Sequence, residues 1–221
     1  MSSIAIDGPA GAGKSTVAKM VASRLGSVYV DTGAMYRAMA LHVVEKGADI
    51  NDASAVAKAA ESAVITIERK NGEQRVILGG TDVTGELRTE RVSSAASVVS
   101  VVPEVRAKLV ALQRELAEKE DVVMDGRDIG TVVLPNAALK IFLTADAGVR
   151  AHRRYLELIE KGEEADEEQI LRDIKERDER DMTRAESPLK KADDAVAVDS
   201  SYISAEEVAD RILELWREKS E

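Results

Sequence analysis

The sequence predicts an α/β fold in which one five-stranded parallel sheet is flanked by helices on both faces. Short apolar runs at residues 4–7, 28–30, 122–125, 139–143 and 195–198 have the length and composition of buried strands. Stretches with helical periodicity separate these runs, and strands that alternate with helices form parallel sheets. Hydrophobic residues make up 44% of the 221 residues, which is enough for a sizeable core, but aromatic residues account for only 3%. Aliphatic side chains therefore have to fill that core.

A glycine-rich loop follows the first predicted strand. Four residues separate Gly8 from Gly13, and Lys14 and Ser15 follow directly, which completes the pattern G-x-x-x-x-G-K-[ST]. A helix is predicted to begin near Lys14 and to end at Gly26. Glycines let the backbone wrap round an anion, and the helix N-terminus adds a positive end. We therefore interpret the loop as a triphosphate site rather than as a flexible turn; its residues are Gly8, Pro9, Ala10, Gly11, Ala12, Gly13, Lys14, Ser15 and Thr16. Lys14 would reach the β- and γ-phosphates, and the Ser15 hydroxyl would ligate Mg²⁺.

The second predicted strand ends at Asp31, and a helix follows with Tyr36 and Arg37 in its first turns. Asp31 and Thr32 are ordinary N-cap residue types, and an arginine on such a helix can simply be solvated. The pattern alone does not decide between a capping role and a functional one.

Residues 64–70 and 73–78 form a different kind of element. The dipeptide Asn71-Gly72 joins them, which is a strong signal for an antiparallel hairpin. Because a local hairpin interrupts the alternation of strands and helices, we interpret the region from about residue 32 to about residue 100 as an inserted subdomain.

The chain returns from this insertion through a predicted helical stretch that contains Ser97. Pro103 is placed to open the next helix, with Arg106 in its first turn. The apolar face of that helix is predicted to consist of Val105, Leu109, Leu112 and Leu116.

The third predicted strand ends in the sequence Asp125-Gly126-Arg127-Asp128. Open α/β sheets bind ligands at the carboxyl ends of their strands, so the charges in this turn are candidates for a site. Asp125 stands where the second strand of a phosphate-loop site often ends in a carboxylate. Solvated loop charges are the alternative interpretation.

A helix containing Arg153 follows the fourth strand, and residues 163–184 then form a highly charged stretch. Alternating charges on a helix usually make a solvated face with weak ion pairs. However, Arg177, Arg180 and Arg184 are spaced 0, 3 and 7 and would lie on one side of a helix that extends this far. Three guanidinium groups on one face repel unless an anion meets them, so a functional role is the favoured interpretation.

The fifth strand leads into the last predicted helix. Ser204 and Glu207 have the spacing of a capping box. Its buried stripe is predicted to consist of Val208, Ile212 and Leu215.

Composition excludes several classes of function. The formal net charge of −10 argues against binding nucleic acid through the overall field, although arginines that converge locally can still bind a small anion. The lack of cysteine and the presence of only two histidines argue against disulfides and zinc sites. Because no long apolar run and no leader pattern occur, we expect a soluble cytoplasmic protein with no membrane partner. We also expect a monomer.

Four segments together resemble the bacterial cytidylate kinases: residues 8–16, Asp-Thr-Gly-Ala-Met-Tyr-Arg at 31–37, Asp-Gly-Arg-Asp-Ile-Gly-Thr-Val-Val at 125–133, and Lys-Glu-Arg-Asp-Glu-Arg-Asp at 175–181. The first is shared by many families, whereas the other three in this order are much more specific. The resemblance covers nearly the whole chain and implies the P-loop nucleoside monophosphate kinase fold. It further implies a core at 1–31, 103–159 and 187–221, a nucleoside monophosphate-binding subdomain at 32–102 and a short helical lid at 160–186.

The resemblance also implies ATP-dependent phosphorylation of CMP and dCMP to CDP and dCDP, by direct in-line transfer with Mg²⁺. The implied catalytic residues are Lys14, Arg127, Arg177, Arg180 and Arg184, and Arg153 is implied on the adenine side. The implied substrate-binding residues are Thr32, Tyr36, Arg37, Ser97, Arg106, Asp125, Arg127, Asp128, Arg177 and Asp181. Within this set, Arg37 and Arg127 match contacts to the monophosphate, and Ser97, Arg106 and Asp128 match contacts to cytosine. Arg177 and Asp181 match contacts to the substrate ribose and phosphate. Some relatives carry serine in place of Thr32.

Three rival interpretations remain. A kinase of the same fold that acts on shikimate or AMP would keep the phosphate loop but need a different acceptor pocket. A GTPase switch would need an Asn-Lys-x-Asp motif, which the sequence lacks. A purely structural nucleotide-binding protein would not need three arginines in phase.

Overall fold

The computed structural model describes residues 1–70 and 72–220, and the chain divides into two compact units. The first unit consists of Met1–Tyr29 and Lys119–Glu221, and the second consists of Val30–Glu118. The second unit extends beyond the predicted insertion because it includes the helix α5 (Pro103–Lys119). Lys108 on this helix donates hydrogen bonds to the carbonyl oxygens of Ala60 and Glu61, which lie in the same unit.

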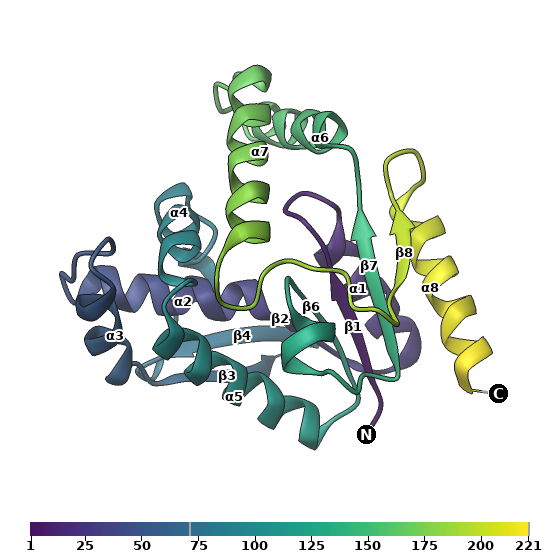
Figure 1. The fold of residues 1–221 in the computed structure, drawn as a ribbon, viewed down its shortest axis with the longest axis horizontal. Helices are drawn as coiled ribbons and strands as arrows, with labels where there is room; N and C mark the ends of the chain where they lie inside the picture. Colours follow the sequence, from purple (N-terminus) through teal and green to yellow (C-terminus); the bar gives the residue numbers. More distant parts are fainter. Residues whose placement is uncertain (71, 221) are drawn as a thin grey trace. The chain divides into compact units, whose positions relative to one another are not determined.

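The five-stranded sheet has the strand order β2-β6-β1-β7-β8, and all of it except the last two residues of β2 belongs to the first unit (Figure 1). The strands are β1 (Ser3–Asp7), β2 (Val28–Asp31), β6 (Val122–Gly126), β7 (Leu139–Thr144) and β8 (Val196–Asp199). Strand β1 pairs in parallel with β6 and β7, and β7 pairs in parallel with β8. The predicted five-stranded parallel sheet is therefore confirmed. In the β1–β6 register Asp7 lies opposite Gly126, which brings the ends of these two strands together.

Helices α1 (Lys14–Leu25), α6 (Ala147–Glu160), α7 (Glu167–Thr183) and α8 (Ala205–Ser220) belong to the same unit. Helices α1 and α8 pack on the sheet, and their apolar residues share one core with Ile4, Ile6 and Ile141. The predicted capping box of α8 is confirmed: the Ser204 amide and hydroxyl donate to the Glu207 carboxylate at 2.7 and 2.8 Å, and the Glu207 amide donates back at 3.2 Å. The predicted stripe is also buried as expected.

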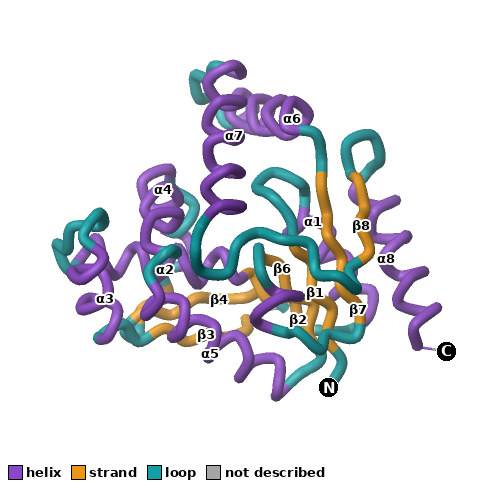
Figure 2. The backbone as a smooth tube through the Cα atoms, viewed as in Figure 1, coloured by secondary structure: helices purple, strands orange, loops and turns teal. Residues whose placement is uncertain are grey.

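Helices α6 and α7 pack against each other, and a long loop of residues 184–195 then leads to β8 (Figure 2). A π-helical turn, η2 (Ile129–Val133), follows β6. The sequence pattern did not predict this turn. No helix in the described part of the chain is both long and apolar enough to cross a membrane.

The second unit combines a small sheet with helices. Its elements are α2 (Thr32–Glu45), α3 (Ala53–Glu61), β3 (Ile65–Lys70), β4 (Glu73–Leu78), β5 (Thr81–Asp82), η1 (Thr84–Glu86), α4 (Glu90–Val99) and α5. The predicted hairpin is confirmed, because β3 and β4 are antiparallel and Lys70 pairs with Glu73. Asn71 of the predicted turn lies outside the described residues. Strand β5 was not predicted, because two residues are too short for a periodic signal.

The predicted apolar face of α5 is partly wrong. Val105 and Leu109 are buried, but Leu112 and Leu116 are only half-buried. Gln113 is 1% exposed and occupies the next position of the buried stripe. Buried positions recur every four residues at Val105, Leu109 and Gln113, so Leu112 and Leu116 lie to one side of the buried stripe.

Candidate active site

The glycine-rich loop is confined by close backbone contacts. A Cβ atom at Gly8 would lie 1.9 Å from the carbonyl oxygen of Leu143 on β7, so only glycine fits there. Gly13 has a φ of 86° and is the N-cap residue of α1. Because glycine has no side chain, Gly13 ends the loop without covering the first amides of the helix, which are donors that lack helical partners. Loop and helix start therefore form an anion site at the carboxyl end of β1.

Lys14 is buried beside this loop, with 5% of its surface exposed. Its Nζ donates a 2.7 Å hydrogen bond to the carbonyl oxygen of Pro9. Burial, followed by the positive charge of Arg127, lowers the pKa of Lys14 well below its ordinary value. The carboxylates of Asp125 and Asp7 oppose this effect. A bound polyphosphate would act in the same sense as these carboxylates and favour the charged ammonium.

Ser15 and Asp125 join the start of α1 to the end of β6. The Ser15 hydroxyl donates to Asp125 Oδ2 at 2.9 Å, and the Tyr29 hydroxyl donates to Asp125 Oδ1 at 2.9 Å. Among the described residues, no group of three or more His, Cys, Asp or Glu side chains could hold a metal ion. A hydroxyl and a single carboxylate nevertheless suit Mg²⁺, which takes few protein oxygens and completes its shell with phosphates and water. The donor set at Ser15 thus fits this ion.

The loop after β6 is tied to the end of α7. Arg127 Nε donates to Asp181 Oδ2 at 2.9 Å, and the Arg184 guanidinium lies 3.8 Å from Asp128 Oδ1. Burial alone would raise the pKa of Asp181, but Arg127, and then Arg177 and Arg184, bring it below its ordinary value. The structure thus brings five of the predicted site residues into one cluster of alternating charge.

The helix does not extend far enough to carry all three arginines of the predicted face. Helix α7 ends at Thr183, and Arg184 has a ψ of 141°, so only Arg177 and Arg180 share the helix. Arg184 enters the cluster from the loop instead, where its Nε donates to the Ser187 carbonyl at 2.7 Å. Ser187 has a φ of 49°, in the left-handed region that residues other than glycine seldom adopt. Arg180 has 41% of its side chain exposed and pairs with Glu176 at 2.7 Å.

A buried ion pair that the sequence did not indicate links the phosphate loop to α7. Arg150 on α6 donates to both carboxylate oxygens of Asp178, at 3.2 and 2.6 Å, and also to the carbonyl oxygen of Ala10 at 3.0 Å. The two side chains are 5% and 11% exposed. No sequence pattern indicates this pair, because alternating charge is also typical of solvated helices.

We expect Asp178→Ala to lower the free energy of unfolding by about 3–5 kcal/mol, because the Arg150 charge would stay buried without its partner. Urea denaturation followed by circular dichroism measures this change. The matched control is Glu176→Ala, which removes an exposed partner on the same helix and should change stability by less than about 1 kcal/mol. Equal effects of the two substitutions would contradict the prediction.

Arg153 lies at another edge of the phosphate loop. Its Nη2 donates to the Ser200 carbonyl at 2.5 Å, and the Ser200 hydroxyl donates to the Ala12 carbonyl at 3.0 Å. Arg153 is thus connected to the loop through Ser200, the residue that follows β8. Its predicted place on the adenine side stays a prediction.

The other predicted substrate-binding residues lie in the second unit, at the start of α2 and on α4 and α5. Thr32 is buried as the first residue of α2, and Asp31 caps this helix by accepting a 2.8 Å hydrogen bond from the Ala34 amide. Arg37 lies 3.3 Å from Asp31, and its Nε is buried with no hydrogen-bond partner. Gln74 on β4, which the sequence did not single out, pairs with the backbone of Asp31 at 2.8 and 3.2 Å. Asp31 is therefore a structural cap that also orients Arg37.

Arg106 connects three elements of this unit. The Arg106 guanidinium lies 5.6 Å from the centre of the Tyr36 ring, which is a cation–π distance. It also donates to the Ser100 carbonyl at 3.2 Å, and the Ser100 hydroxyl donates to the Ser97 carbonyl at 3.0 Å. Arg106 lies in the first turn of α5, as predicted, and is buried, with 5% of its surface exposed. The structure thus brings Tyr36, Ser97 and Arg106 together.

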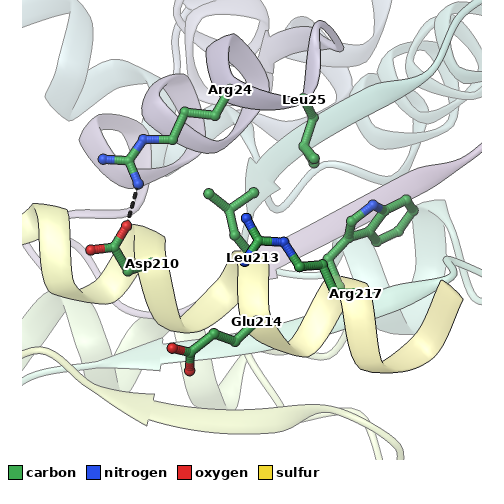
Figure 3. Close-up of a pocket in the computed structure, with 7 residues that line it drawn as sticks. Arg24, Leu25, Asp210, Leu213, Glu214 and Arg217 are labelled. Atoms are coloured by element: carbon green, nitrogen blue, oxygen red, sulfur yellow. Dashed lines mark hydrogen bonds and ion pairs between the residues drawn. The ribbon is translucent and has the colours of Figure 1, made fainter. Parts of the chain in front are cut away.

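A separate pocket lies at the C-terminal end of α1, where this helix packs on α8 (Figure 3). Arg24 pairs with Asp210 at its edge, and Leu25, Leu213 and Trp216 contribute apolar surface. Helix α1 is 12 residues long, so its two ends are about 18 Å apart at 1.5 Å per residue. This pocket is therefore not part of the phosphate site.

The parallel sheet, the loop that ends β1 and the lysine at the start of α1 define a P-loop nucleotide-binding protein. A sequence model of the family described as "Cytidylate kinase" matches residues 4–218, and the chain belongs to this family. It is 53% identical to the cytidylate kinase of Caldicellulosiruptor bescii, over 96% of this chain and 94% of the relative. It is 49% identical to that of Shouchella clausii, over 98% and 96%. A solved structure of an uncharacterized protein from Eubacterium ventriosum has a TM-score of 0.53 at 15% identity, covers 97% of this chain and 98% of that one, and shows the fold alone.

Proposed function

We propose that this protein transfers the γ-phosphoryl group of ATP to CMP and dCMP, which yields ADP with CDP or dCDP. The observation that carries the proposal is membership of the cytidylate kinase family over residues 4–218, on a chain whose phosphate loop has every motif residue in place. The charged cluster around Arg127, Asp128 and Asp181 supports it, because phosphoryl transfer needs positioned cations more than covalent help from the protein.

On the ATP side, the loop amides and the Lys14 ammonium bind the β- and γ-phosphates. Ser15 would hold Mg²⁺ directly, and Asp125 would act through bound water; when bound, this ion supplies positive charge to the phosphate oxygens. Arg153 contacts the adenine side. Arg177, Arg180 and Arg184 neutralise charge on the transferred group, so that the acceptor oxygen can approach in line with the leaving oxygen.

On the acceptor side, Arg37 and Arg127 bind the monophosphate, and the buried unpaired Nε of Arg37 supplies a donor suited to an anion. Thr32 and Tyr36 line the pocket. Ser97, Arg106 and Asp128 bind cytosine, while Arg177 and Asp181 contact the ribose and phosphate. These roles accompany a nucleoside monophosphate-binding subdomain at 32–102, a core at 1–31, 103–159 and 187–221, and a lid at 160–186. The protein acts as a cytoplasmic monomer.

A coupled ADP-release assay across AMP, GMP, UMP, CMP and dCMP tests the proposal, with shikimate as a further acceptor. The expected result is that CMP and dCMP have the highest kcat/KM values. Higher kcat/KM for AMP or for shikimate would replace this proposal with one of the two rival kinases.

Asp128→Ala is expected to remove most of the preference for CMP over UMP. Cytosine presents an amine where uracil presents a carbonyl, so the buried Asp128 carboxylate would accept from the first and repel the second. A charge-assisted hydrogen bond is worth roughly 1.5–3 kcal/mol, and leaving the buried carboxylate unpaired against uracil costs at least as much. Together these two effects predict a wild-type preference of about 100-fold or more. The measurement is kcat/KM for both nucleotides on both proteins. An unchanged ratio would show that Asp128 does not read the base.

A further inference from the structure

Asp7, the last residue of β1, has a buried carboxylate that none of the roles above uses. It is 4% exposed. One of its oxygens accepts a 2.7 Å hydrogen bond from the Ile129 amide, and the other accepts a 2.7 Å hydrogen bond from the Gly130 amide. Each oxygen therefore has its own backbone donor, and both donors come from one turn 122 and 123 residues away in the sequence.

This turn directly follows the residues that carry the acceptor-side chemistry. Arg127 and Asp128 lie between the end of β6 at Gly126 and the start of η2 at Ile129. Gly126 is fixed on one side because it pairs with Asp7 in the sheet. The Asp7 side chain fixes the other side through Ile129 and Gly130. The segment with Arg127 and Asp128 is therefore held at both ends by the residue that precedes the phosphate loop.

The fit at Gly130 is tight. A Cβ atom there would lie 3.3 Å from Asp7 Oδ2 and 3.1 Å from Lys140 Cδ on β7. A larger residue at this position would have to displace the carboxylate or the lysine stem. Any side chain here would therefore require one of these neighbours to move by a few tenths of an ångström.

The surroundings of Asp7 on balance favour its neutral form over its ionised form. Burial raises the pKa of Asp7 to about 6, although the two amide donors lower it. Asp128 adds to the increase, and Lys14 opposes it. Because the folded pKa lies above the unfolded value, the ionised carboxylate makes the protein less stable as the pH rises through about 6. A residue selected for stability alone would not need this charge.

We infer that Asp7 is a positioning residue that fixes Arg127 and Asp128 relative to the phosphate loop. The inference rests on the proposed roles of Arg127 and Asp128. Asp7 couples the two sides of the reaction, because the strand that carries it leads directly into Gly8 while its side chain holds the acceptor-side turn. A displacement of about 1 Å in such a segment can lower the rate about 100-fold.

The kinetic test uses Asp7→Asn, which keeps one acceptor oxygen, and Asp7→Ala, which removes both. We expect kcat/KM for CMP to fall about tenfold or more in Asp7→Asn and further in Asp7→Ala, with the Kd for ATP within about twofold of wild type. The CMP-to-UMP ratio should fall as well, since Asp128 loses its position. The matched control is Asp82→Asn, which alters another aspartate that accepts two hydrogen bonds, from the Thr84 amide and hydroxyl, in the second unit. If the Kd for ATP rises by the same factor by which kcat/KM for CMP falls, the positioning role is overturned.

A second test needs no active enzyme. Amide protons bonded to a carboxylate shift when it titrates, so the Ile129 and Gly130 resonances of the wild-type protein should shift together with a midpoint near pH 6. They should stay constant in Asp7→Asn. Resonances that do not titrate in the wild type would overturn the inference even if CMP kinase activity is found. If CMP is not a substrate while both amides titrate, the proposed function fails but the contact of Asp7 with the turn stands.

Discussion

Lys14→Ala is expected to lower kcat by about 10³-fold while the protein keeps its fold. The ammonium group stabilises charge that grows on the transferred phosphoryl group, so its loss affects the transition state more than the ground state. Because Lys14 is 5% exposed, water cannot easily replace it.

A circular-dichroism melt and a steady-state assay on the same preparation check both parts of this prediction. Lys58→Ala is the control, because it removes an exposed lysine from α3 in the second unit. Activity of Lys14→Ala within tenfold of wild type would remove Lys14 from the mechanism. A large fall in Tm would instead assign Lys14 a structural role.

Arg184→Ala is expected to lower kcat by up to about 10³-fold with a smaller effect on the Kd for ATP. The Arg184 side chain is 6% exposed, held by the Ser187 carbonyl, and 3.8 Å from Asp128. These contacts hold the guanidinium in place, and fixed charges stabilise a transition state without reorganisation. Arg180→Ala should also lower kcat, but less, because Arg180 is 41% exposed and has to leave Glu176 before it can act.

Single-turnover and ATP-binding measurements on both variants separate the two effects. A variant that raises only the KM for ATP, at unchanged kcat, would show that the arginine binds the ground state. If Arg180→Ala proves the more harmful substitution, the exposed arginine is the one that reaches the transferred group.

The sequence by itself determined the elements whose signals are local. The five apolar runs, the hairpin and the capping box at Ser204 each depend on residues a few positions apart, and all three predictions are confirmed. The phosphate loop could be predicted for the same reason, because its glycines, Lys14 and Ser15 are adjacent in the chain. Spacing over a few residues sets backbone conformation and the buried face of an element before distant parts of the chain meet.

Only the tertiary structure decided which distant residues share a contact. The Ser15 hydroxyl bonds to Asp125, 110 positions away, and Asp7 accepts a hydrogen bond from Ile129, 122 positions away. Arg150 pairs with Asp178, which is one of many carboxylates in a charged stretch. Arg184 is not on the predicted helical face because α7 ends at Thr183 and Arg184 has an extended ψ of 141°. These contacts depend on strand order and helix packing. A charge that the fold buries needs its partner for stability, whereas a charge that stays exposed is solvated and contributes little. The periodicity of the sequence therefore cannot predict which charged residues are buried in pairs.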